Sequence, residues 1–291
     1  MLSLPVLAQV VVNGVNLGAI YILMALGFTM IFGIMRIVNF AHGAFAMLGG
    51  FALYFLLMDA HVPFLLALPL GALLVGAGSL LAERFVLRHL YHNELQGMIA
   101  TLGLSMVMIY LAAIVFGVSQ RSVPAVYSEI FFFGPLVVPM DRLVVLGIAA
   151  VTLLLFFLFM RYTKPGLAMR VAAQDLEVAE AQGINAAAHY QAAFFIASSL
   201  AALAGGLIGQ LYALSPFMGA TPLMKSFIVV ILGGLGSIPG AALGGLLLGM
   251  AESSLTTFFG ASTAQLASFG IVMLVLVLRP QGLFGHAERD S

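Results

Sequence analysis

Few side chains in this sequence could carry out chemistry, and three of them stand inside or beside long apolar stretches. Asn39 and His42 fall in the segment Arg36-Ile-Val-Asn-Phe-Ala-His-Gly43, and Glu252 lies in an otherwise apolar run. A polar or ionisable group is costly to bury among apolar residues, so each is a candidate for function. A structural role is the alternative: Asn39 and His42 would satisfy loop backbone groups, and Glu252 would reach an interface near a helix end.

The usual catalytic and nucleotide-binding patterns are missing from the sequence. Cysteine is absent, which excludes a disulfide, a thiolate nucleophile and a zinc–thiolate site. The patterns G-x-x-x-x-G-K-[S/T], G-x-S-x-G and H-E-x-x-H do not occur. His89 and His92 beside Glu94 are better explained as an interfacial loop than as a metal site. We therefore expect no enzyme activity, no catalytic residue, no bound metal and no cofactor of the chain's own.

Composition places the chain in a membrane. Of its 291 residues 63% are hydrophobic and 8% are charged, whereas a soluble domain carries about 25% charged residues. The mean hydropathy is +1.15. Inside a bilayer every backbone amide must be paired internally, which leaves helices or closed barrels. The apolar runs are long and continuous, as in Leu143–Met160, so we predict helices. The formal net charge is zero, which gives no general attraction to nucleic acid.

Nine apolar stretches predict an all-α, polytopic transmembrane bundle of about 8–9 spans in a single domain over residues 1–291, since one span takes about 20 residues. The first stretch is unusually long and carries Asn13 and Asn16. The stretch 223–235 is too short and runs into a series of glycines, which predicts a broken or re-entrant helix. The nine stretches are 6–33, 43–58, 63–84, 95–116, 142–160, 190–211, 223–235, 240–258 and 263–279.

The distribution of Lys and Arg predicts the orientation, because cytoplasmic loops carry the excess. Eight of these residues fall in loops 34–42, 84–94 and 161–189 and in the tail 279–291. The opposite side holds three: Arg121, Arg142 and Lys225. We therefore expect the eight-charge side and the C-terminus to be cytoplasmic and the N-terminus to lie outside.

Two polar segments interrupt the apolar pattern. Residues 117–141 contain three prolines and alternate β-branched and aromatic residues, which predicts an extracytoplasmic loop with strand-like character. Residues 161–189 form the most polar stretch. Within it Pro165 suits a helix start and Gly183 a helix end, which predicts a short amphipathic helix over 165–182 in the cytoplasm. Such a helix can dock into a groove on a partner protein.

Glycine-rich segments at 39–50 and 233–249 are candidates for the lining or gate of a transport path. Each places a break before a helix rich in small residues, and broken segments in corresponding halves of a transporter mark its substrate pathway. The candidate pathway residues are Asn39, His42, Gly43, Gly233, Gly234, Gly236, Gly240 and Glu252.

The sequence resembles the branched-chain amino-acid permeases of the LivH type, which belong to ATP-binding-cassette importers. Asn13-Gly14 with Gly18 and Asn39-Phe-Ala-His-Gly43 carry the first part of the resemblance. Gly166-Leu-Ala-Met-Arg170 with Gly183-Ile-Asn185 carries the second. The third runs from Pro216 and Gly219 through Val230–Gly240, Gly244-Gly245 and Glu252 to Arg279–Gly285. The coupling segment keeps Glu177, Ala179 and Gly183 of the fuller family pattern only loosely.

The resemblance implies a multi-pass permease in the bacterial inner membrane, working by alternating access within membrane lipid. Its implied partners are a second similar permease subunit, two cytoplasmic ATPase subunits that bind the ATP, and a periplasmic substrate-binding protein. It makes residues 161–189 the coupling loop, with Gly166, Arg170, Asp175, Glu177 and Gly183 as candidate contacts. Relatives suited to urea, short amides or aromatic acids leave the substrate open. The rivals are an ion-coupled secondary transporter, for which Glu252 is the coupling candidate, and a passive solute channel.

Overall fold

Eleven α-helices, one 3₁₀ turn and one β-hairpin make up the described part of a computed structural model. The description covers residues 4–90, 93–124, 126–134, 136–174, 176–183, 185–279 and 281–284. The elements are α1 (Leu4–Met35), α2 (His42–Met58), α3 (Phe64–Phe85), η1 (Leu87–Leu90), α4 (Glu94–Phe116), β1 (Ile130–Phe133), β2 (Leu136–Pro139), α5 (Met140–Tyr162), α6 (Lys164–Gln174), α7 (Leu176–Ala181), α8 (Ala186–Leu211), α9 (Ala220–Gly233), α10 (Ile238–Phe259) and α11 (Ala261–Leu278).

The predicted helical bundle is confirmed. Seven of the described helices are long and apolar enough to cross a membrane, and two shorter apolar helices, α2 and α9, lie among them. The short helix predicted over 223–235 is α9, which has 14 residues and ends at Gly233. The stretch 43–58 was expected to be an ordinary span, but α2 has only 17 residues and falls with α9 among the shorter helices.

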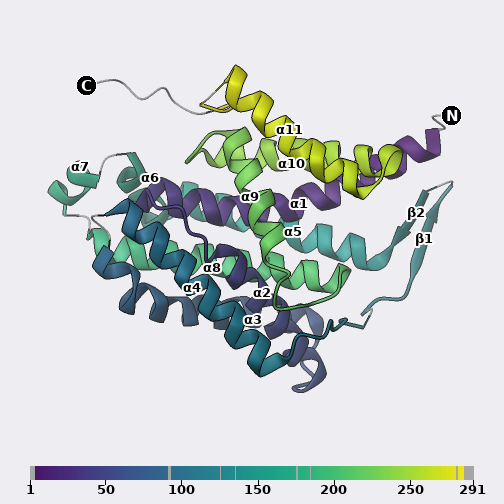
Figure 1. Ribbon diagram of the computed structural model, residues 1–291, viewed down its shortest axis with the longest axis horizontal. Coiled ribbons are helices and arrows are strands. Elements are labelled where there is room, and N and C mark those ends of the chain that lie inside the picture. The colour runs from purple at the N-terminus through teal and green to yellow at the C-terminus, as the bar shows by residue number, and fades with distance from the viewer. Residues whose placement is uncertain are drawn as a thin grey trace.

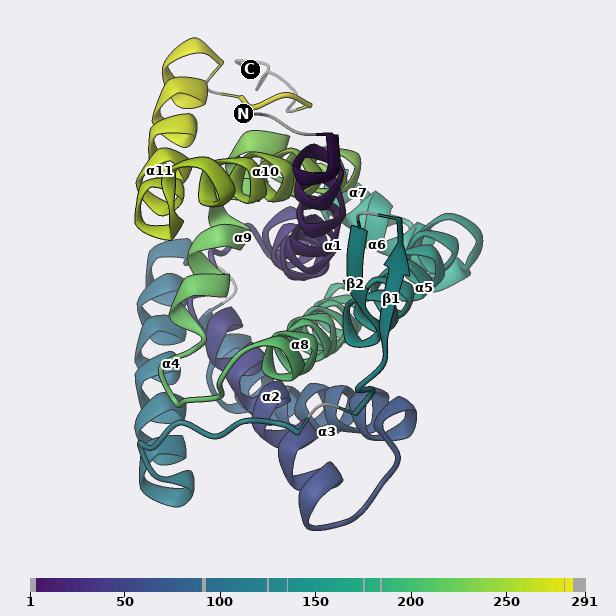
Figure 2. The same cartoon turned by 90° about the vertical axis from the view of Figure 1, so that its right-hand side faces the viewer.

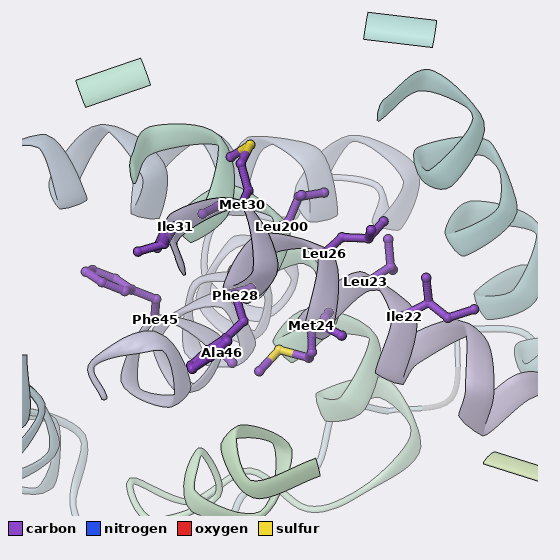
Figure 3. Packing of buried hydrophobic residues seen from close by; sticks show 14 of the residues in the cluster. Ile22, Leu23, Met24, Leu26, Phe28, Met30, Ile31, Phe45, Ala46 and Leu200 are labelled. Carbon is purple, nitrogen blue, oxygen red and sulfur yellow. The ribbon is translucent and has the colours of Figure 1, made fainter. Parts of the chain in front are cut away.

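The long helices α1 and α8 form the centre of the bundle, and the other helices surround them (Figure 2). Residues of α1 between Ala19 and Met35 are almost all buried, and they make the main hydrophobic core together with α8. Figure 3 shows residues of this core, among them Leu26 and Met30 of α1, Phe45 of α2 and Leu200 of α8. In contrast α4 and α11 keep most of their apolar side chains exposed, which suits helices that meet lipid or another subunit.

The helices pair in a pattern that relates the two halves of the chain. In the first half a long helix (α1) is followed by a short one (α2) and a long one (α3), and α8, α9 and α10 repeat this order. The first long helix of each half packs along the last of the other, α1 on α10 and α8 on α3. In this order the break at residues 36–41, which the first glycine-rich segment contains in part, corresponds to residues 212–219. The second glycine-rich segment, 233–249, is not its counterpart.

The two polar segments lie at opposite ends of the bundle, as Figure 1 shows. Segment 117–141 contains the antiparallel hairpin β1–β2, with Ile130 opposite Pro139, which confirms the strand-like character. The hairpin stands beside the first turns of α1, where the Val137 amide donates to the Gln9 Oε1 at 3.3 Å. The helices α6 and α7 and the last described residues lie at the other end.

Candidate functional site

The two short helices begin inside the bundle and touch each other at their starts. His42, the first residue of α2, is fully buried, and its Nε2 lies 2.9 Å from the carbonyl oxygen of Met24, in the middle part of α1. Gly43 packs directly on Gly219, the residue before α9. Two helix N-termini thus meet within the apolar interior, an arrangement that transporters use near the centre of the membrane.

Asn39 has the structural contact that was considered for it, whereas His42 contacts a carbonyl within α1 and not a loop group. The Asn39 Oδ1 accepts a hydrogen bond from the Ala41 amide at 3.0 Å, so its side chain holds the turn that leads into α2. Thr101 of α4 supports the same loop, because its hydroxyl accepts from the Phe40 amide at 3.2 Å. Arg36, with φ 55°, is exposed at the end of α1. In the described structure the Asn39 Nδ2 and the His42 Nδ1 are buried without a hydrogen-bond partner.

Glu252 lies in an ion pair that the sequence did not reveal. Its Oε2 is 2.9 Å from the Nζ of Lys225 on α9, and it accepts a hydrogen bond of 2.9 Å from the Tyr21 hydroxyl on α1. The Lys225 Nζ also donates to the Ser268 Oγ on α11 at 3.1 Å. Four helices, α1, α9, α10 and α11, therefore contribute to one buried polar cluster, which we call the Lys225–Glu252 cluster.

Lys225 was counted with the charges of the side opposite the cytoplasm, but it is not a loop residue and so should not have entered that count. The residue lies within α9 and is 4% exposed. Of the three charges assigned to that side, Arg121 and Arg142 remain. The signal was present in the sequence, because Lys225 falls inside the apolar stretch 223–235, where a basic residue calls for an acidic partner.

The glycines of segment 233–240 form a tight turn between α9 and α10. Gly234 and Gly236 have positive φ values of 102° and 79°, which L-residues with side chains rarely adopt. The backbones of Gly233 and Gly240 are in direct contact. Ser237 caps α10, since its Oγ accepts from the Gly240 amide at 3.1 Å.

The chain beyond α11 returns to this turn and closes the end of α9. The Leu283 amide donates to the Leu232 carbonyl at 2.9 Å, and the Phe284 amide donates to the Gly233 carbonyl at 3.0 Å. These carbonyls belong to the last turn of α9, where no helical amide is available to them. The glycine segment is thus held by the C-terminal residues as well as by its own packing.

The predicted cytoplasmic helix is helical on both sides of Asp175, as α6 and α7, and Asp175 itself lies outside the described residues. Gly166 is buried where α6 packs on the end of α5, and its amide donates to the Thr163 Oγ1 at 3.1 Å. Arg170 is exposed. Glu177 lies in α7, and Gly183 follows it with φ 83°, as expected for a residue that ends a helix.

The predicted residues do not form one site. Asn39, His42 and Gly43 lie at the start of α2, Glu252 lies in the Lys225–Glu252 cluster, and Gly233–Gly240 form the turn beyond α9. The first two groups are nevertheless neighbours, because Tyr21 of the cluster and Met24, which contacts His42, are three residues apart on α1.

Comparison with known proteins shows similarity over nearly the whole chain. Residues 10–278 match a family model described as the permease component of branched-chain amino acid transport systems. The chain is 31% identical over 301 residues to the "High-affinity branched-chain amino acid transport system permease protein LivH" of Escherichia coli (strain K12), covering 97% of each chain. It is 33% identical over 300 residues to the permease protein BraD of Pseudomonas aeruginosa, again covering 97% of each.

A solved structure shares the fold. The chain superposes with a TM-score of 0.50 on a chain of the structure titled "PsaBC from Streptococcus pneumoniae in complex with Fab", with 13% sequence identity. The superposition covers 95% of this chain and 91% of the other. At this identity the likeness concerns the arrangement of helices alone.

Proposed function

The chain belongs to the family of permease components of branched-chain amino acid transport systems, and from this we propose that it is the membrane subunit of an ATP-driven importer for leucine, isoleucine and valine. The observation that carries the proposal is the family match over residues 10–278, nearly the whole of the helical bundle. The chain has no phosphate-binding loop in its sequence, so its energy would come from partner subunits that bind ATP.

The proposed partners are a second homologous permease subunit, two cytoplasmic ATPase subunits and a periplasmic substrate-binding protein. The second permease subunit is either a copy of this chain or a different relative. Helices α6 and α7 would receive the motion of the ATPases, since they stand at one end of the bundle and expose Arg170 and Leu167. The opposite end, with the β1–β2 hairpin, would face the periplasm. The last described residues, 281–284, stand at the α6–α7 end, and we expect the C-terminus to be cytoplasmic as well.

Transport would proceed by alternating access without covalent chemistry. The ATPases would move α6, which is joined to the end of α5 through the Thr163 hydroxyl and Gly166. That motion would pass to α1, on which both α5 and α6 pack. The starts of α2 and α9 and the turn Gly233–Gly240 would line or gate the path.

A reconstitution experiment tests this function. The chain would be purified with its permease partner and ATPase subunits, placed in liposomes with the binding protein, and assayed for uptake of radiolabelled leucine with and without ATP. We expect uptake that requires ATP and all the subunits. Uphill uptake by the chain alone would instead support an ion-coupled transporter, and ATP-independent equilibration would support a channel. ATP-driven uptake of urea, a short amide or an aromatic acid in place of leucine would support the importer role with a different substrate.

A further inference from the structure

The Lys225–Glu252 cluster places two opposite charges inside the bundle of a chain in which only 8% of the residues are charged. The Lys225 side chain is 5% exposed and that of Glu252 is 16% exposed, so both charged ends are largely withdrawn from solvent. Burying two opposite charges costs desolvation free energy that their attraction only partly returns. A purely structural link between helices would be made at lower cost by packing or by neutral hydrogen bonds.

The hydrogen bonds of the cluster leave each charged group with further capacity. Within the described structure, the contacts from Lys225 and from Tyr21 both fall on the Oε2 of Glu252, so they leave the Oε1 for another donor. An ammonium has three N–H donors, and the described contacts of Lys225 occupy two of them, toward Glu252 and Ser268. One acceptor and one donor of opposite charge thus stand side by side.

The cluster lies close to the starts of the two short helices, α2 and α9. Tyr21 is three residues from Met24, whose carbonyl contacts His42 at the start of α2. On α1, Phe28 lies seven residues beyond Tyr21, two helical turns along the same side of the helix, and its ring lies 4.6 Å from that of Phe227 on α9. The Phe227 ring also lies 5.9 Å from that of Phe40, just before α2. The charged cluster and the aromatic rings are therefore neighbours along α1, about two helical turns apart.

We propose that the Lys225–Glu252 pair binds the charged end of a zwitterionic α-amino acid, with the substrate carboxylate on Lys225 and its ammonium on Glu252. This assignment rests on the proposed function and gives its substrate class a physical basis. The apolar side chain of the substrate would extend toward Phe28 and Phe227. In the structure the two residues neutralise each other.

Selectivity follows from charge balance. A zwitterion brings both a cation and an anion, so each residue exchanges one ionic partner for another and no buried charge is left alone. Urea or a neutral amide cannot do this, and a monovalent acid or amine would leave one of the two residues unpaired. Leaving a buried charge without its partner is strongly unfavourable, and sites built for a polar group reject analogues that lack it.

The test compares the assembled wild-type transporter with the double variant Lys225→Met/Glu252→Gln, using uptake of leucine and of its uncharged analogue 4-methylpentanamide. Removing both charges together avoids an orphaned charge, and such a replacement is often neutral for stability. The glutamine also keeps an acceptor for Tyr21. The control, Arg84→Met/Glu129→Gln, removes one exposed positive and one exposed negative charge elsewhere.

We expect the double variant to assemble with its partner subunits, while its leucine uptake falls by about a hundredfold relative to the control. Leucine uptake at the control rate would overturn the assignment and leave the proposed function standing. ATP-driven wild-type uptake of the amide in place of leucine would overturn the assignment and the proposed substrate, while the importer role would stand. If the double variant does not assemble, the site is tested on the wild-type protein instead, by photo-crosslinking with the diazirine analogue of leucine. We expect labelling at α9 and α10, and we expect leucine to block it and the amide not to. Labelling confined to other helices would refute the site.

Discussion

Gly43 on α2 and Gly219 ahead of α9 are in backbone contact, and each occupies the space in which the other would carry a side chain. A Cβ on Gly43 would collide with the Gly219 carbonyl oxygen and would lie 2.9 Å from the Cβ of Leu223. The two short helices can start side by side only because both residues lack side chains. The contact fixes where the two halves of the chain meet at the proposed pathway.

The first prediction is that Gly43→Ala destabilises the protein by about 1–3 kcal/mol, the usual cost of forcing extra atoms into a packed interior. The neighbour to be displaced is backbone, which cannot rotate away. The measurement is the thermal unfolding midpoint in detergent. Gly78→Ala on α3 is the matched control, since nothing lies within 4 Å of its added Cβ, and it should leave the midpoint unchanged or slightly raised. An equal effect of both substitutions would contradict the proposed contact.

The second prediction concerns the C-terminal residues that close α9. Gly282 has φ 74°, and a Cβ there would lie 2.6 Å from both the Gly234 amide nitrogen and the Ile231 carbonyl oxygen. Gly282→Ala should therefore release the bonds from Leu283 and Phe284 to the end of α9. Amide hydrogen exchange in α9 should rise, while exchange in α3 should not. Gly270→Ala on α11, where the added Cβ meets nothing within 4 Å, is the control, and faster exchange in α9 with that variant too would refute the link.

Helix positions could be predicted from the sequence because the bilayer sets the length of an apolar run. The stretch 95–116, for example, is α4 (Glu94–Phe116), and the stretch 240–258 is α10 (Ile238–Phe259). The start of α2 inside the bundle could not be found in this way. Its 17 residues are apolar on all sides, so the sequence pattern does not distinguish a helix that starts at the surface from one that starts within.

Contacts between residues that are distant in the sequence could not be predicted either. Glu252 was a candidate from its own position, but its partners lie on three other helices, and apolar helices without a polar face give no signal of which sides meet. Lys225 was visible as a charge in an apolar stretch, yet only the packing of α9 on α10 brings it to Glu252. The return of residues 281–284 to the end of α9 had no signal in composition or periodicity.

The third prediction separates the two central glycines of the proposed gate. Replacing either Gly236 or Gly240 with valine is expected to reduce uptake, but the structure gives the two substitutions different causes. Gly240 packs on the Gly233 backbone, so Gly240→Val should lower stability as well as uptake. A Cβ on Gly236 would have room, because its nearest neighbour, the Gly33 Cα, would lie 3.7 Å away. The φ of Gly236 is 79°, however, and a residue with a side chain adopts this conformation at a cost of about 1–2 kcal/mol.

Gly236→Ala is therefore the sharper test of gating, and its effect should be a several-fold loss of leucine uptake in a transporter that still assembles. The measurements are uptake in proteoliposomes and recovery of the assembled complex. The matched control is Gly103→Ala on α4, which adds a Cβ with nothing within 4 Å. If Gly236→Val and Gly240→Val both transported like the unmodified protein, the gate hypothesis would be abandoned.

The fourth prediction concerns α6 as the contact for the ATPase subunits. Leu167 is 53% exposed and Arg170, three residues on, is exposed beside it, while Met169 and Ala172 of the same helix are buried in the bundle. One face of α6 is thus used for packing within the chain and the other is free. Residues three apart on a helix lie on the same side, so Leu167 and Arg170 form a small apolar and basic surface suited to a groove with acidic residues.

Leu167→Asp and Arg170→Glu should each weaken docking of the ATPases without lowering the stability of the permease. A minority of interface residues, those at the centre of the contact, cost more than about 1 kcal/mol when they are lost. We place Leu167 and Arg170 among them and expect a loss of roughly tenfold in ATPase affinity and a similar loss in ATP-dependent uptake. Co-purification of the ATPase subunits and the thermal midpoint of the permease alone measure the two effects separately. Met169→Asp is the contrasting variant, since its side chain points into the bundle: it should lower the thermal midpoint itself. Normal co-purification with both surface variants would place the ATPase contact elsewhere on the chain.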